Sequence, residues 1–232
     1  MKIIFIIFGL FIIYITFVGI GVYRKIHISQ GMVKSAKPYQ RTSDDVTRSL
    51  LVLGDSTAVG VGADTPEDSA PALYAEHIQA TLVENRAISG AKIADVLEQV
   101  KGINREKYSE ILLQIGANDI VALKSAKAAE QELRTLLLSL PTHEKLTVLI
   151  CGNVGSATLI PWFLRPLYTK RTVEYHNLYG KIVPEFGGIY INLYTPKILE
   201  AFENEPHKYL AEDAFHPSSV GYRLWYDEIV SE

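Results

Sequence analysis

The chain has 232 residues, 48% of them hydrophobic and 21% charged, which is enough to bury one sizeable core and argues against two catalytic domains. A formal charge of -3 offers no basic surface for phosphate backbones, and the sequence holds no nucleic-acid-binding motif, so nucleic acid is not an expected partner. The single cysteine, Cys151, cannot form an intramolecular disulfide, and neither it nor the histidines show the spacing of metal ligands.

An uncharged run opens the chain. Ile3–Val22 is twenty residues long, and a helix of that length, at about 1.5 Å per residue, matches a hydrocarbon core of roughly 30 Å. The run is longer than the apolar core of a signal peptide, about 7–15 residues, and Gly19-Ile20-Gly21 is a poor cleavage site. We therefore predict a single-pass membrane anchor at residues 1–23, with a cleaved signal peptide as the alternative.

Residues 24–48 are polar and have no steady period, as expected for a linker that separates the anchor from a domain at 49–232. Basic residues lie on both sides of the apolar run. Lys2 precedes it, and a larger group follows it: Arg24, Lys25, Lys34, Lys37 and Arg41. The positive-inside rule places the domain in the cytoplasm, whereas a short tail with one lysine indicates an inward-facing start and an outward-facing domain. The side of the membrane stays open.

From residue 49 onward, short apolar runs alternate with segments whose apolar residues recur every three or four positions. The runs predict strands at Leu50–Gly54, Asn85–Ile88, Ile111–Ile115, Thr147–Cys151 and Ile189–Leu193. The periodic segments predict helices at Pro71–Leu82, Ile93–Val100, Ala126–Leu140 and Val173–Val183, with a final helix from Pro217 through Ile229. This alternation predicts a three-layer α/β/α sandwich around a mostly parallel sheet.

Polar and glycine residues follow three of the predicted strands, at the edge of a parallel sheet where ligands bind. Ser56 follows the first strand, Gly90 the second and Asn118 the third. Far downstream, Asp213 and His216 are three residues apart, which is close enough for one turn to join their side chains by a hydrogen bond.

A serine hydroxyl becomes a nucleophile when a neighbouring base removes its proton, and histidine has a suitable pKa. We predict Ser56 as the nucleophile, His216 as its base and Asp213 as the carboxylate that orients the imidazole. The backbone amides of Ser56 and Gly90 and the side-chain amide of Asn118 are candidate donors for an oxyanion hole.

These elements together resemble the SGNH hydrolases, also called the GDSL esterases and lipases. The resemblance covers roughly Leu50–Val230 and rests on four elements in the family's order: Gly54-Asp55-Ser56, Gly90, Gly116-Ala117-Asn118-Asp119, and Asp213 with His216. Thr57 departs from the family's name motif, which has leucine there. The resemblance implies a flavodoxin-like fold and the hydrolysis of esters or thioesters through an acyl-serine intermediate, without metal or cofactor.

The segment Val154–Tyr179 combines apolar and basic residues and includes Trp162 and Phe163. Next to a membrane anchor, these two aromatic residues are candidates for the wall or lid of an acyl-binding site; packing of an ordinary connection is the alternative. We expect a membrane-anchored serine esterase that acts on small or lipid-like esters. A carbohydrate O-acetyl esterase or O-acyltransferase of the cell envelope and a non-catalytic binding module are the alternatives.

Overall fold

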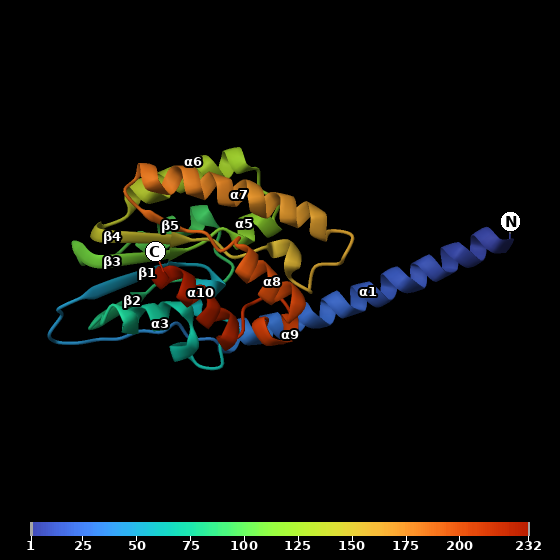
Figure 1. The fold of residues 1–232 in the computed structure, drawn as a ribbon, viewed down its shortest axis with the longest axis horizontal. Coiled ribbons are helices and arrows are strands. Elements are labelled where there is room, and N and C mark those ends of the chain that lie inside the picture. Colours follow the sequence, from blue (N-terminus) through green and yellow to red (C-terminus); the bar gives the residue numbers. More distant parts are fainter. Residues whose placement is uncertain (1, 232) are drawn as a thin grey trace.

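The protein's fold is described by a computed structural model, which places residues 2–231. Five parallel strands form one sheet in the order β2-β1-β3-β4-β5 (Figure 1). The strands are β1 (Ser49–Gly54), β2 (Leu82–Asn85), β3 (Lys107–Gln114), β4 (Thr142–Leu149) and β5 (Ile189–Ile191). The predicted parallel α/β sheet is confirmed.

Helices cover both faces of this sheet, in the three layers that the sequence predicts (Figure 1). The α-helices are α1 (Lys2–Ser35), α2 (Ser56–Val59), α3 (Ala70–His77), α4 (Val96–Val100), α5 (Ala117–Val121), α6 (Ala126–Ser139), α7 (Arg165–Glu185), α8 (Pro196–Asn204), α9 (Pro206–Tyr209) and α10 (Ser219–Ser231). Single turns of 3-10 helix lie at Pro66–Asp68, Ile93–Asp95 and Val154–Ser156.

Strand β1, which lies between β2 and β3, is buried on both faces, because its side chains alternate between two hydrophobic clusters. Leu51 and Leu53 pack with residues of α4, α6 and α7, whereas Leu50 and Val52 pack with residues of α3, α8 and α10. This two-sided burial fixes β1 within the sheet and holds its carboxyl end at the edge where Ser56 follows.

The observed elements differ from the predicted ones mainly at their ends. Strand β2 lies at Leu82–Asn85 instead of Asn85–Ile88. The Asn85 side chain bonds to nearby backbone at this end: its Nδ2 donates to Ala58 O and its Oδ1 accepts from Ala87 N. The backbone N–H groups of Arg86 and Ile88 still donate to Val52 O and Gly54 O of β1. Helix α3 also ends earlier than predicted, and Gln79 takes the left-handed conformation just before β2.

Downstream, helix α7 begins earlier than predicted and takes up much of the segment that we expected to form a lid. Helices α8 and α9 were not predicted from the sequence. Each of these three helices has a proline in its first turn, where the missing N–H disturbs no helical hydrogen bond.

Helix α1 continues past the predicted end of the apolar run at Val22 and ends at Ser35, three residues before Pro38. Much of the expected linker is therefore helical. From residue 18 onward, its less exposed residues recur at spacings of four and three, which indicates that one side of the helix lies against the domain: Val18, Val22, Lys25, Ser29 and Met32. Within the described residues, α1 is the one helix long and apolar enough to cross a membrane.

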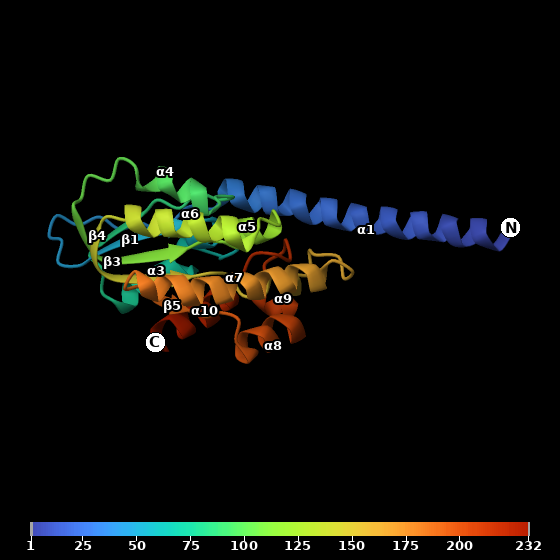
Figure 2. The same ribbon diagram turned by 90° about the horizontal axis from the view of Figure 1, so that it is seen from above.

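The two termini of the described chain lie far apart, with the amino end at the tip of α1 and the carboxyl end of α10 at the domain (Figures 1 and 2). Helix α1 projects from the end of the domain toward which the carboxyl ends of the strands point, and Figures 1 and 2 show the same relation from two directions. Any site at this edge of the sheet therefore lies near the base of α1.

His176, on α7, provides a test of the packing between this helix and the sheet. It is buried, its Nε2 lies 3.1 Å from Cys151 O, and its Nδ1 contacts the Tyr190 hydroxyl. Burial lowers the pKa of His176 to about 4. The unfolded chain therefore binds a proton at this residue at higher pH than the folded chain, and stability falls as the pH falls from about 6.5 toward 4.

We expect the stability difference between the wild type and His176→Gln to shrink by about 3 kcal/mol between neutral pH and pH 4. Urea unfolding of both proteins across this pH range measures the difference. The exposed His207 supplies the control variant, His207→Gln. A pH-independent difference for His176→Gln would contradict the prediction.

Candidate active site

Two contacts fix the carboxyl end of β1. A Cβ atom on Gly54 would lie 1.9 Å from Gln114 O, so only glycine fits at this position, which has a φ of 142°. The Gln99 side chain then donates to Gly54 O at 2.7 Å and accepts from Gly54 N at 2.9 Å. Gln99 lies 45 residues away and carried no signal in the sequence.

Asp55 caps the short helix α2, which begins with Ser56. Its Oδ1 accepts hydrogen bonds from the backbone N–H of Thr57 at 2.9 Å and from the Thr57 hydroxyl at 2.8 Å. The threonine that replaces the motif's leucine therefore strengthens the cap. Burial raises the pKa of Asp55 to about 6, and the two bonds from Thr57 oppose this shift.

The structure brings Ser56, His216 and Asp213 together. Ser56 Oγ lies 2.8 Å from His216 Nε2, and His216 Nδ1 lies 2.5 Å from Asp213 Oδ2. Since Nδ1–H donates to the carboxylate, Nε2 is left to accept the serine proton. All three side chains are buried, and Ser56 is only 7% exposed.

The loop before α10 holds the carboxylate in its ionised form. Burial favours neutral Asp213, but hydrogen bonds from His216 and Phe215 outweigh it and hold the pKa of Asp213 below its ordinary value. Its Oδ1 accepts the backbone N–H groups of both residues at 3.0 Å. Ala214, which lies between Asp213 and Phe215, takes the left-handed conformation with a φ of 58°, and this closes the turn.

Three candidate donors face the same cavity as Ser56 and His216, namely the amides of Ser56, Gly90 and Asn118. Gly90 has a φ of 85° and open space around it. Among the hydrogen bonds of residues 2–231, neither the Ser56 nor the Gly90 backbone N–H has an acceptor, so both are free for a ligand. Asn118 Nδ2 donates one bond to Ala91 O at 3.0 Å, which leaves its second hydrogen free.

Asp119 holds the turn that carries Gly90. Its Oδ2 accepts the backbone N–H of Ile93 at 2.9 Å, and its Oδ1 pairs with Lys124 Nζ at 2.7 Å. The last residue of the third motif therefore positions the second motif, a role that the sequence did not reveal.

Two cavities meet at Ser56 and His216. The inner one, about 50 Å³, is lined mostly by apolar residues that include Ile198, Phe202 and Trp225. The outer one, about 720 Å³, also borders Gly90 and is closed on one side by residues of α1. The part of the chain that is described contains no cluster of three His, Cys, Asp or Glu side chains that could hold a metal ion.

The structure does not bring Trp162 and Phe163 to the serine. Neither residue lines the inner or the outer cavity, whereas their neighbours Leu159 and Ile160 line the outer one. The Trp162 side chain is 67% exposed, and its Nε1–H donates to the Tyr14 hydroxyl on α1 at 2.7 Å. Trp162 therefore lies beside the N-terminal helix, and the Phe163 ring packs edge-on against Trp162.

Comparisons with solved structures support the same fold. One similar structure is TesA, with 18% identity and a TM-score of 0.59 over 79% of this chain and 97% of that one. Phospholipase A1 from Streptomyces albidoflavus NA297 has 19% identity and a TM-score of 0.57 over 79% of this chain and 98% of that one. An acetylxylan esterase from Geobacillus stearothermophilus has 17% identity and a TM-score of 0.55 over 80% of this chain and 93% of that one.

A search of curated proteins gave no match. The model of the GDSL-like Lipase/Acylhydrolase family matches residues 52–224, which include every motif residue from Gly54 to His216. This match confirms the resemblance that the sequence motifs indicate. The chain therefore belongs to the GDSL-like Lipase/Acylhydrolase family and, as a member of it, is a serine ester hydrolase.

Proposed function

We propose that the protein is a membrane-anchored serine esterase that works through an acyl-serine intermediate, with Ser56 as nucleophile, His216 as base and Asp213 as the orienting carboxylate. The observation that carries this proposal is the continuous hydrogen-bond chain from Ser56 Oγ through His216 to Asp213, with distances of 2.8 and 2.5 Å. This chain borders a cavity that also holds two unoccupied backbone N–H donors.

In the first half-reaction, Ser56 Oγ attacks the ester carbonyl carbon while its proton passes to His216 Nε2. The Asp213 carboxylate stabilises the resulting imidazolium. The carbonyl oxygen becomes an oxyanion and accepts hydrogen bonds from Ser56 N, Gly90 N and Asn118 Nδ2. The bond to the leaving oxygen then breaks, and the alcohol takes the proton from His216.

The second half-reaction repeats these steps with water. His216 takes a proton from the water as its oxygen attacks the acyl carbon, and it returns that proton to Ser56 Oγ when the acid leaves. Transfer of the acyl group to another alcohol uses the same steps, with that alcohol in place of water.

A lipid-like ester is the substrate class that we favour, because α1 is apolar enough to hold the enzyme at a bilayer. Similar folds serve different substrates, since the comparison structures include a phospholipase and an acetylxylan esterase. The small inner cavity supports a second candidate, a carbohydrate O-acetyl esterase, because about 50 Å³ suits a short acyl group. An assay with both substrates distinguishes the two candidates. Release of fatty acid from lysophospholipid favours the lipid esterase, and release of acetate from acetylated glycan favours the carbohydrate O-acetyl esterase.

The Ser56→Ala variant tests the nucleophile. We expect turnover of p-nitrophenyl butyrate to fall by at least about 10³-fold and labelling by a fluorophosphonate probe to disappear, because no other oxygen replaces Oγ. Circular dichroism and thermal melting check the fold, and Ser43→Ala, at an exposed serine of the linker, is the matched control. Retained labelling of Ser56→Ala would overturn the assignment, and an unlabelled wild type would favour the binding module.

The Asp213→Asn variant tests the orienting carboxylate. In this variant, the amide oxygen at position 213 accepts the backbone N–H groups of Phe215 and His216, as Asp213 Oδ1 does in the wild type. The amide NH₂ group then takes the place of Asp213 Oδ2 and points at His216 Nδ1. The imidazole then carries its proton on Nε2, where it cannot accept the serine proton. We expect kcat to fall by about 10²–10⁴-fold, measured with p-nitrophenyl butyrate, while the exposed neighbour's variant, Glu212→Gln, stays near wild type. An unchanged kcat would remove Asp213 from the mechanism.

Membrane extraction tests the anchor. We expect the expressed full chain to stay in the membrane pellet after an alkaline carbonate wash and to dissolve in detergent, because Ile3–Val22 buries its apolar surface in lipid. Intact mass spectrometry should find the N-terminal segment still attached. Release by carbonate, or a mass without this segment, would instead favour a cleaved signal peptide. Protease protection in intact cells determines the side.

A further inference from the structure

The carboxyl-terminal part of α1 borders the active site directly. Five of its residues line the outer cavity together with Ser56, Gly90 and His216, and they fall on one side of the helix: Ile26, Ser29, Gln30, Val33 and Lys34. Leu159 and Ile160, from the loop that precedes α7, also line this cavity. The outer cavity is thus a groove between the anchor helix and the catalytic domain.

The sizes of the two cavities decide where a long acyl chain can lie. The inner cavity, about 50 Å³, holds a short group, whereas the groove along α1 has about 720 Å³. Ile26 and Val33 on α1, together with Leu159 and Ile160, offer apolar contacts to a hydrocarbon chain. The space for a large apolar substituent is therefore beside α1.

The loop Leu159–Leu164 relates this groove to the depth of the membrane. Trp162 in this loop donates a hydrogen bond to Tyr14, which lies eight residues before the end of the apolar run at Val22. Eight helical residues correspond to about 12 Å. If Ile3–Val22 crosses the bilayer, Trp162 lies within the hydrocarbon layer, where this bond gives the indole N–H its acceptor.

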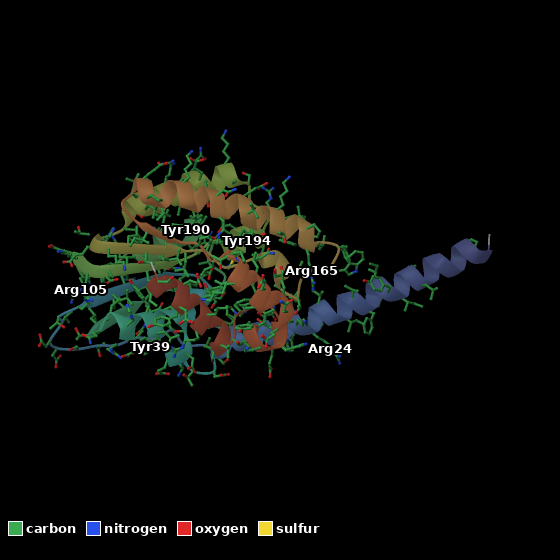
Figure 3. All side chains as sticks on the ribbon, viewed as in Figure 1. Arg24, Tyr39, Arg105, Arg165, Tyr190 and Tyr194 are labelled. Carbon is green, nitrogen blue, oxygen red and sulfur yellow. The ribbon has the colours of Figure 1, made fainter. Side chains whose placement is uncertain are left out.

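The basic residues at this end of the molecule agree with a position of loop Leu159–Leu164 in the bilayer. Arg24 on α1 and Arg165 at the start of α7 lie at the end of the domain from which α1 projects (Figure 3). Helix α1 contains no Asp or Glu. Basic side chains at this level suit the anionic head groups of a bilayer, while the exposed Trp162 and Phe163 suit its apolar interior.

We propose that Ile26–Lys34 of α1 forms one wall of the substrate groove, and that the groove receives the acyl ester of a lipid resident in the same membrane. This inference rests on the proposed serine esterase activity and deepens it. The anchor helix then sets substrate specificity, because the chain that fills the groove contacts Ile26 and Val33 as the ester carbonyl reaches Ser56. Loop Leu159–Leu164 enters the bilayer and places the groove's mouth in the lipid layer.

A pair of isoleucines on α1 allows a matched test. Ile26 lines the groove and is 43% exposed, whereas Ile28 lies outside the groove and is 38% exposed. The full-length enzyme is reconstituted in nanodiscs of phosphatidylcholine and phosphatidylglycerol with lysophosphatidylcholine as the embedded substrate. Released fatty acid is measured beside hydrolysis of soluble p-nitrophenyl acetate, which is too short to use the groove.

We expect Ile26→Gln combined with Val33→Gln to lower the ratio of lipid to acetate hydrolysis by at least about tenfold, because glutamine contacts a hydrocarbon chain poorly. Ile28→Gln should keep the wild-type ratio. An unchanged ratio in the double variant, or an equal fall in Ile28→Gln, would overturn the groove proposal.

The same two assays on the wild-type enzyme distinguish a failure of this inference from a failure of the proposed activity. Hydrolysis of p-nitrophenyl acetate without any hydrolysis of embedded lipid would overturn the lipid groove and leave the serine esterase standing. Absence of turnover on both esters, together with no labelling by a fluorophosphonate probe, would overturn the proposed activity itself.

Tryptophan fluorescence tests the position of the loop independently of activity. The chain has two tryptophans, and Trp225 is buried inside the domain, so quenching by lipids brominated in the acyl chain reports on Trp162. We expect strong quenching in the wild type and little in Trp162→Phe. Equal, weak quenching in both would place the loop outside the bilayer and overturn this part of the proposal.

Discussion

The hydrogen bond between Ser56 Oγ and His216 Nε2 joins residues 160 positions apart, and the rest of the site depends on it. It forms because β1 delivers Ser56 to the carboxyl edge of the parallel sheet, where the loop between α9 and α10 also brings His216. The backbone at this edge has little room to change its position. A side chain at Gly54 would collide with Gln114 O, and the Gln99 amide holds the same peptide from the other side. The backbone that carries Ser56 therefore has little freedom to move away from the imidazole.

Buried carboxylates around this bond are stabilised in different ways, and the differences follow from their donors. Asp213 accepts two backbone N–H groups and one imidazole N–H, so its pKa falls despite burial. Asp55 accepts only from Thr57, and burial raises its pKa to about 6. The pKa values of these two carboxylates thus shift in opposite directions, because Asp213 has more donors to offset its burial and pairs with His216. The ionised Asp213 is suited to stabilise a positive imidazolium.

Helix α1 connects the proposed membrane location with the proposed chemistry. A flexible tether would let the domain take any orientation above a bilayer. A helix that continues to Ser35 and lies along the domain fixes the edge of the sheet relative to the helix axis (Figures 1 and 2). The groove beside Ile26 and Val33 and the contact between Tyr14 and Trp162 both depend on that fixed relation. The anchor and the substrate-binding surface can therefore be parts of one element.

The sequence by itself determined the sheet, the order of its layers and the local turns that carry Ser56, Gly90, Asn118 and His216, because each turn directly follows an apolar run or precedes a helix. Only the tertiary structure decided which distant groups support those turns. Gln99 and Asp119 act on backbone far from them in the chain, and no local pattern reports such contacts. The helical extension of α1 was not predicted from the sequence for a related reason. The side of this helix that faces the outer cavity carries polar residues such as Ser29 and Gln30 as well as apolar ones, so the sequence shows no continuous apolar stripe there.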